Sequence, residues 1–158
     1  MKKLVLVLAL VAFLGAGTAF ADFGIGVHVG GAGGLGDLGY GGGLNLAFSN
    51  IYIYIDTAFR GSSLGVSGAV DFVSFLNIDI VDTLSFYLRL GIPVSIWGFG
   101  SDFGLAAGVR VPVGLSWKPT EMIEVFFQLI PQVGIRILPS VNIWDDIFGS
   151  NLGIRFWL

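Results

Sequence analysis

Apolar residues alternate one by one with small or polar residues over most of this chain. In residues 84–96, Leu, Phe, Ile and Val occupy every second position, while Ser, Tyr, Arg, Gly and Pro occupy the others. A period of two is typical of a β-strand whose two faces meet different surroundings. The alternation recurs, bounded by turn residues, in eight segments: 23–30, 38–48, 51–59, 64–72, 84–96, 105–117, 123–137 and 151–158.

The two faces of these segments differ in size and polarity. One face is bulky and apolar, and the other is mostly Gly, Ala and Ser with a few charges. The second face is poorly suited to keep a small protein soluble, but it suits the narrow interior of an eight-stranded barrel. Each segment is near the ~9–11 residues that a tilted strand needs to cross a bilayer. We therefore predict an all-β fold, an antiparallel up-and-down transmembrane β-barrel of eight strands with its bulky face toward lipid.

The connections of such a barrel are short at its periplasmic end and longer at its outer end. Short turns are predicted at residues 49–50, 77–82 and 118–121, and the outer loops at 30–39, 60–63, 97–104 and 138–149. Three of the four outer loops are longer than the two shortest turns, and residues 60–63 are the exception. The outer loops contain four carboxylates, Asp37, Asp102, Asp145 and Asp146. We therefore expect an acidic outer rim.

The N-terminal residues have a different pattern. Lys2 and Lys3 precede the uninterrupted apolar run 4–14, and the segment ends in the small-residue pattern Ala19-Phe20-Ala21. This order predicts a signal peptide, residues 1–21, that is cleaved after Ala21 and leaves a barrel domain of residues 22–158. The alternative is a retained membrane anchor, because residues 4–21 carry no charge.

The C-terminal residues follow a recognisable order of polar, any, Gly, any, any, aromatic, any and hydrophobic. The matching positions are Asn151, Gly153, Phe156 and Leu158. This motif resembles the C-terminal β-signal of bacterial outer-membrane barrels. With the signal peptide and the alternating segments, the whole chain resembles the small OmpA- and OmpX-type barrels. The resemblance implies recognition by the barrel-assembly machinery and residence in outer-membrane lipid, although Leu158 departs from the usual terminal aromatic residue.

Charged residues also fall on the face away from lipid. They are Asp56, Asp71, Arg89, Arg110, Glu124, Arg136 and Arg155. An isolated charge in a narrow, low-dielectric interior costs several kcal/mol, so these residues are expected to pair with one another. The narrow barrel favours a salt-bridge network that fills and closes the interior. An ion path or a proton-linked gate is the alternative.

Several kinds of chemistry lack support in the sequence. Only 12% of the residues are charged and the net charge is -3, so no basic surface for nucleic acid is present. Cys is absent, and the single His28 is interpreted as a hydrogen-bonded interior residue rather than a catalytic or metal-binding one. Residues 31–36 match G-x-G-x-x-G without a following helix, so we interpret them as a loop. We expect no cofactor and no metal.

These observations favour a non-enzymatic outer-membrane protein with a structural or surface-interaction role, whose outer loops meet an extracellular ligand. A narrow channel for small or hydrophobic solutes, as in OmpW-like barrels, is the second interpretation. A lipid-modifying membrane enzyme is disfavoured by the missing cluster of His, Ser and Asp. A soluble exported barrel that binds lipid is the non-membrane alternative.

Overall fold

The computed structural model of this protein describes residues 23–34, 37–60, 63–97, 103–143 and 148–158. The predicted signal peptide, with Ala19 and Ala21, lies outside the described residues. Within the described ranges, no helix has the length and hydrophobicity needed to cross a membrane. The described strands are β1 (Phe23–Gly34), β2 (Asp37–Phe48), β3 (Ile51–Arg60), β4 (Ser63–Val81), β5 (Leu84–Trp97), β6 (Gly104–Arg110), β7 (Val113–Thr120), β8 (Ile123–Leu138), β9 (Asn142–Ile143) and β10 (Phe148–Trp157).

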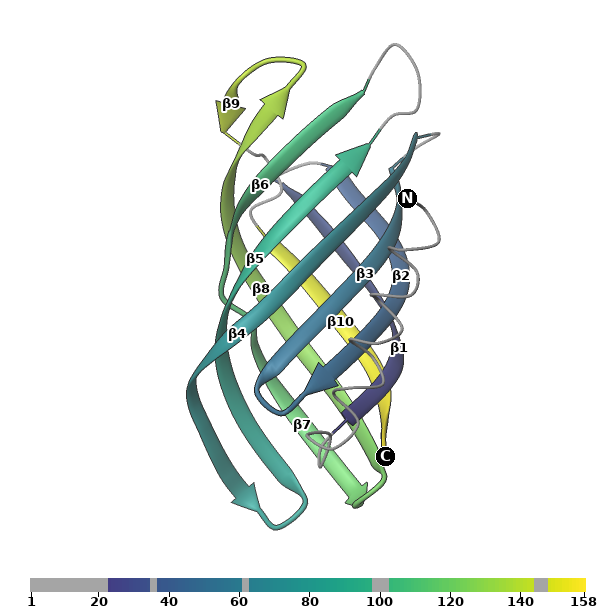
Figure 1. The fold of residues 1–158 in the computed structure, drawn as a ribbon, viewed down its shortest axis with the longest axis vertical. Coiled ribbons are helices and arrows are strands. Elements are labelled where there is room, and N and C mark those ends of the chain that lie inside the picture. The colour runs from purple at the N-terminus through teal and green to yellow at the C-terminus, as the bar shows by residue number, and fades with distance from the viewer. Residues whose placement is uncertain (1–22, 35–36, 61–62, 98–102, 144–147) are drawn as a thin grey trace, which may run out of the picture.

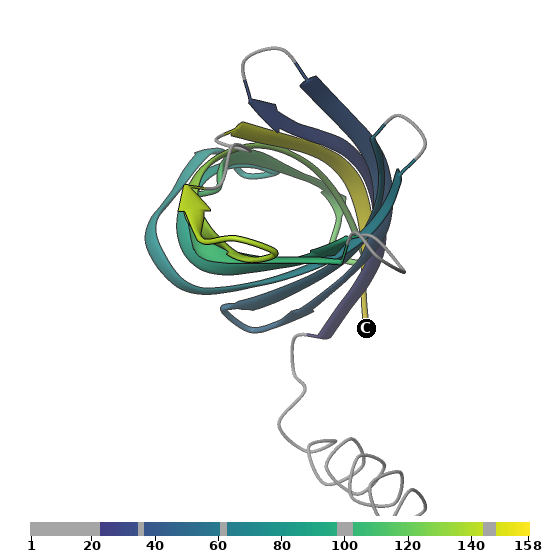
Figure 2. The same cartoon turned by 90° about the horizontal axis from the view of Figure 1, so that it is seen from above.

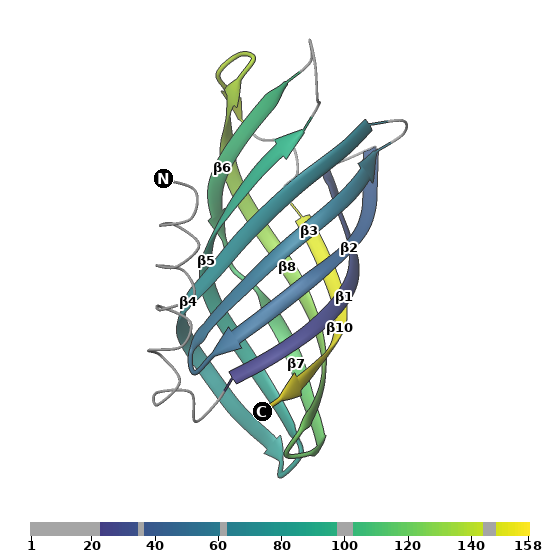
Figure 3. The same cartoon turned by 45° about the vertical axis from the view of Figure 1, so that its right-hand side comes forward.

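The strands form one antiparallel sheet that closes into a ring (Figure 1). From β1 to β5, each strand pairs with the next along the chain. The last strand, β10, pairs with β8 on one side and with β1 on the other, so the two ends of the sheet meet. Figure 2 shows the ring from above, and Figure 3 shows the strands running obliquely around it with β1 and β10 side by side.

The described strands number ten rather than the predicted eight. The predicted strand 105–117 is divided into β6 and β7 at Val111 and Pro112, because proline has no N–H to donate to the ladder. Both pieces lie between β5 and β8. Backbone bonds continue across the break, since Arg89 N–H donates to Pro112 O and Val111 N–H donates to Pro131 O, each at 2.9 Å. The short strand β9 pairs with β8.

One end of the ring, the turn end, carries three two-residue turns, at residues 49–50, 82–83 and 121–122. The first was predicted and is confirmed. The predictions of turns at 77–82 and 118–121 are wrong in their bounds, because β4 continues to Val81 and β7 continues to Thr120. Both chain ends of the ring lie here, since Leu158 N–H donates to Phe23 O at 2.8 Å.

The opposite end of the ring is the loop end. The predicted loop 30–39 is largely strand, because β1 extends to Gly34 and β2 begins at Asp37. Asp102, Asp145 and Asp146 lie outside the described residues, as does the side chain of Asp37. The acidic outer rim therefore stays a prediction.

Side chains alternate between the outside and the inside of the ring as the sequence pattern predicts. Val27 is 52% exposed on the outside, whereas His28, the next residue, is 4% exposed. Along β8, Phe127 and Leu129 are exposed, whereas Gln128 between them is fully buried. Among the described residues, more polar or charged side chains than apolar ones are buried. The core of this molecule is therefore polar and its surface is apolar.

Strand β4 departs from simple alternation. It spans 19 residues, and its pairing with β5 shifts register at three points. The extra residue at each shift is apolar and exposed: Phe72, Phe75 and Ile80. Each bulge therefore places two apolar residues in succession on the strand, and the period of two is lost there. This explains why the sequence pattern predicted the end of the strand too early.

Candidate functional site: the interior of the ring

Asp71 and Arg110 form a buried ion pair in the middle of the ring. Arg110 Nε donates to Asp71 Oδ1 at 2.7 Å, and Nη2 donates to Oδ2 at 2.8 Å. Gly91 of β5 pairs in register with both residues and lies between them. A Cβ at Gly91 would lie 2.0 Å from Asp71 Oδ1, so this glycine leaves room for the carboxylate to reach across β5. The bidentate geometry is the strong form of this pairing.

A second buried ion pair joins the neighbouring strands β8 and β10. Arg155 of β10 donates through Nη1 to Glu124 Oε2 of β8 and through Nε to Asn45 Oδ1 of β2, each at 2.8 Å. Glu124 also accepts hydrogen bonds from Ser116 Oγ at 2.7 Å and from Trp157 Nε1 at 2.8 Å. The carboxylate therefore accepts three hydrogen bonds, one from β7 and two from β10. The bonds of Arg155 cross the line where β10 meets β1.

Asp56 contacts His28 rather than one of the arginines. His28 Nε2 bonds to Asp56 Oδ1, and His28 Nδ1 lies 3.5 Å from Asn45 Nδ2. Gly43 lies between His28 and Asp56 in the strand register and adds no side chain there. Both ring nitrogens of His28 are thus occupied by neighbouring side chains.

The remaining two predicted charges are Arg89 and Arg136. Arg89 is buried between the rings of Tyr52 and Tyr87, with its guanidinium carbon 3.5 Å and 3.8 Å from their centroids. Stacking on aromatic faces stabilises a guanidinium, and burial strengthens the effect. Arg136 lines the cavity described below. Sequence analysis did not identify Tyr87 as a partner of Arg89, although both fall on the inward face of β5.

Large side chains fill the turn-end half of the interior. Tyr54, Tyr87 and Phe126 are almost fully buried, and both tyrosine hydroxyls donate to Gln128 Oε1, at 3.4 Å and 3.1 Å. Glycines on neighbouring strands make room for these rings. A Cβ at Gly114 would lie 2.6 Å from the ring of Tyr87. The result is a packed layer that spans the ring.

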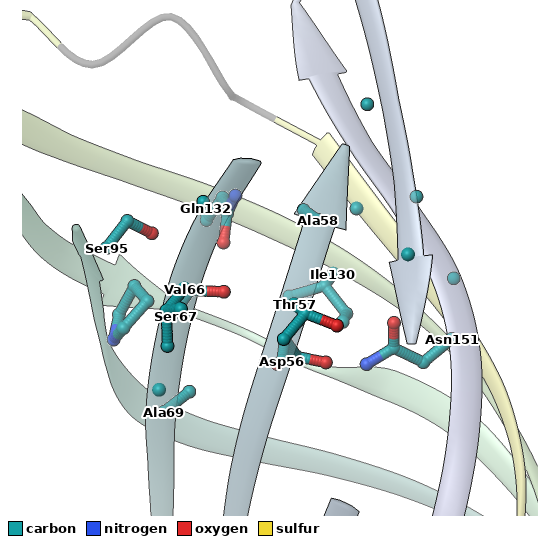
Figure 4. A pocket seen from close by; sticks show the side chains of 18 of the residues that line it. Asp56, Thr57, Ala58, Val66, Ser67, Ala69, Ser95, Ile130, Gln132 and Asn151 are labelled. Carbon is teal, nitrogen blue, oxygen red and sulfur yellow. The ribbon is translucent and has the colours of Figure 1, made fainter. Parts of the chain in front are cut away.

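A cavity of about 380 Å³ lies on the loop side of this layer (Figure 4). Its lining extends from Asp56 and Arg110 to Gly31, Gly39 and Gly149 near the loop end. The polar side chains that line it include Asp56, Ser67, Ser95, Arg110, Gln132, Arg136 and Asn151. The interior therefore has a filled half and an open half.

The residues of the C-terminal motif face both sides of the wall. Asn151 is buried and lines the cavity, and Gly153 makes room for Phe126, whose Cζ lies 2.4 Å from the position of a Cβ there. Phe156 and Leu158 are exposed on the outside. Trp157 points inward to Glu124. Within the described residues, no three His, Asp or Glu side chains are grouped to hold a metal ion.

Comparison with known proteins gives the fold. No protein-family model matches the sequence, and no curated protein matches it. The structure is similar to the N-terminal β-barrel domain of Pseudomonas aeruginosa OprF, with a TM-score of 0.51 and 15% identity, over 85% of this chain and 97% of that one. Neisserial surface protein A is also similar, with a TM-score of 0.46 and 14% identity, over 85% and 95%. The fold is that of the small bacterial outer-membrane β-barrels.

Proposed function

We propose that this chain is an integral outer-membrane β-barrel without enzymatic activity, in which β6 and β7 together form one of eight wall strands. The distribution of side chains carries this proposal. Ion pairs such as Asp71–Arg110 are buried inside, while large apolar residues are exposed around the outside. Exposed apolar surface costs roughly 25 cal/mol per Å² in water. A bilayer removes this cost along the whole wall of the ring.

The proposed orientation places the turn end in the periplasm and the loop end outside the cell. Residues 1–21 act as a signal peptide, cleaved after Ala21, and residues 22–158 form the mature barrel. The motif at Asn151, Gly153, Phe156 and Leu158 presents the closing strand to the barrel-assembly machinery. The OprF likeness supports this fold. The orientation rests on the lengths of the connections, and the export step rests on the sequence.

The proposed role is structural or surface-interacting, with the outer loops meeting an extracellular ligand. The filled half of the interior supports a closed barrel, because the layer of Tyr54, Tyr87, Phe126 and Gln128 crosses it. A lipid-modifying enzyme is disfavoured because both nitrogens of His28 contact other side chains. The cavity of about 380 Å³ is the observation that favours a narrow channel as the second candidate.

Membrane fractionation tests the proposed location. The full chain, expressed with residues 1–21 in a diderm bacterium, should sediment with the outer membrane and require detergent for extraction. Salt or alkaline washing should leave it in place, because apolar contact rather than surface charge holds it. A mature chain that is soluble and monomeric in the periplasm without detergent would instead establish the soluble lipid-binding barrel.

A further inference from the structure

The open half of the interior is created by the size of the inward residues. On β3, β4 and β5, the inward positions toward the loop end are Ala58, Ser67 and Ser95, whereas Tyr54 and Tyr87 occupy the inward positions toward the turn end. The change from large to small side chains ends the packed layer and leaves the cavity above it. Its volume of about 380 Å³ lies at the lower end of the ~300–1,000 Å³ range of small-molecule sites.

Hydrogen-bonding groups surround this cavity from several strands. Asp56, Ser67 and Ser95 occupy successive positions in register on β3, β4 and β5. Gln132 of β8 and Asn151 of β10 line the cavity from other strands (Figure 4). Carboxylate and amide groups are planar and can each bond two adjacent hydroxyls, while serine hydroxyls both donate and accept.

Two charged groups of the described cavity lining are already engaged within the protein. Arg110 is paired with Asp71, and Asp56 contacts His28. An ionic ligand would compete with these pairs in a partly desolvated space, whereas a neutral polar ligand would leave them in place. The cavity therefore favours a neutral molecule with several hydroxyl groups.

We propose that this cavity is a binding site for a neutral polyhydroxylated molecule of the size of one sugar unit. Asp56, Gln132 and Asn151 bond its hydroxyls, Ser67 and Ser95 complete the wall, and Ile130 with Ala69 contact its C–H groups. Only the direction of entry, from outside the cell, rests on the proposed function. The binding itself can be measured on the folded protein in detergent.

The test is an NMR titration of the isotopically labelled, folded barrel in micelles. The probes are methyl α-D-glucoside, methyl β-D-galactoside and N-acetylglucosamine, with glucuronate and glucosamine as charged comparators. Saturable shifts at Ser67, Ser95 and Asn151 with a neutral sugar support the proposal. Maltotriose is titrated in a second arm. If the natural ligand is the end of a glycan, one unit of this longer chain must enter the cavity and cause saturable shifts. If the ligand is a free sugar, entry of the longer chain is not required.

Two variants that fill the cavity test its position. Ser95→Leu and Ser67→Leu should each weaken sugar binding at least tenfold, while Val94→Leu on the outside of β5 should leave it unchanged. Heat-modifiable gel mobility identifies which variants are folded, and one folded cavity variant suffices. The proposal is overturned if no neutral sugar gives saturable shifts, if only a charged comparator binds, or if a folded cavity variant binds as the unmodified protein does.

Discussion

Inside the ring, glycines lie next to large side chains of neighbouring strands. The space that each glycine leaves allows the larger side chain to face inward. A Cβ at Gly24 would lie 2.5 Å from Arg155 Cδ, and one at Gly91 would lie 2.0 Å from the Asp71 carboxylate. In both cases the glycine gives space to a charged group that forms an ion pair along the inner wall of the ring. The abundance of glycine in this chain thus has a packing reason at these positions.

Gly153→Ala tests this interpretation. The added Cβ would lie 2.4 Å from Phe126 Cζ and 2.7 Å from Val27 O, so the ring or the backbone must move. Overpacking of this kind should lower the free energy of unfolding by about 1–3 kcal/mol. Urea unfolding in micelles, followed by tryptophan fluorescence, measures it. Gly68→Ala is the control, because its Cβ would lie 3.6 Å from Tyr54 O; equal losses in the two variants would contradict the interpretation.

Glu124→Gln tests the second ion pair. The change leaves Arg155 buried beside a neutral amide and weakens the bonds from Ser116 and Trp157. Removing one partner of a fully buried pair should cost about 3–5 kcal/mol. Asp79→Asn is the matched control. Its exposed carboxylate accepts a hydrogen bond from Ser85 Oγ, and its replacement should change the unfolding free energy by less than about 1 kcal/mol.

Five of the charged residues that alternation places inward are buried in the structure: Asp71, Arg89, Arg110, Glu124 and Arg155. Alternation does not predict which partners they contact. Asp56 contacts His28 of β1 because Gly43 between them has no side chain. Arg89 stacks between two tyrosines, one of which lies on β3. These contacts depend on the curvature and stagger of the closed ring. A pattern of single residues along one strand carries no information on either.

At the scale of elements, the bulges of β4 explain the main error in the predicted strand boundaries. Three apolar doublets break the period of two: Phe72-Val73, Phe75-Leu76 and Ile80-Val81. The polar residue before each doublet, Asp71, Ser74 or Asp79, still pairs in register with a residue of β5. Apolar doublets flanked by polar residues are the sequence signal that could have identified the bulged strand. The interruption at Pro112 could not be identified in this way, because Pro93 and Pro131 also lack an N–H and lie inside the unbroken strands β5 and β8.

The direction of the two faces can be measured on β5. Leu88 lies on the outer face and Arg89 on the inner face, so a spin label at position 88 in a reconstituted barrel should collide with oxygen more readily than with a polar relaxant. A label at Val111 should behave in the same way. Leu88→Arg should cost about 2–4 kcal/mol if the position lies near mid-membrane. Preferential access of the polar relaxant to both labels would reverse the assignment of the faces.

Deleting Phe156, Trp157 and Leu158 tests the closing strand. Trp157 N–H donates to Met122 O at 2.9 Å and Leu158 N–H donates to Phe23 O, so the deletion removes backbone bonds to both neighbours of β10. Each backbone group left unpaired in lipid costs several kcal/mol. The mature truncated chain should accumulate in the periplasm or be degraded, as immunoblots of cell fractions would reveal. Normal levels in the outer membrane would show that these residues are dispensable.

At the scale of the whole molecule, the apolar outside and the polar inside of the ring follow from residues placed along the entire chain. The outer face is apolar, whereas the inner face combines ion pairs between nearby strands with hydrogen bonds, such as Arg155–Asn45 and Tyr54–Gln128, that form only when the ring is closed. Alternation alone predicted this inversion, because it requires no knowledge of partners. The division of the interior into a filled and an open half required the structure, since it depends on which inward residues share a level.

Conductance distinguishes a closed barrel from a channel. The layer of Tyr54, Tyr87, Phe126 and Gln128 spans the interior, and Arg155 with Glu124 and Trp157 occupies the turn end below it. An ion that crosses this half must displace buried side chains that are bonded to one another. Pure folded protein in planar bilayers should therefore conduct little, and Glu124→Gln should alter stability more than ion selectivity. A channel requires the opposite result: steady single-channel steps in the unmodified protein, with selectivity changed by Glu124→Gln and stability nearly unchanged.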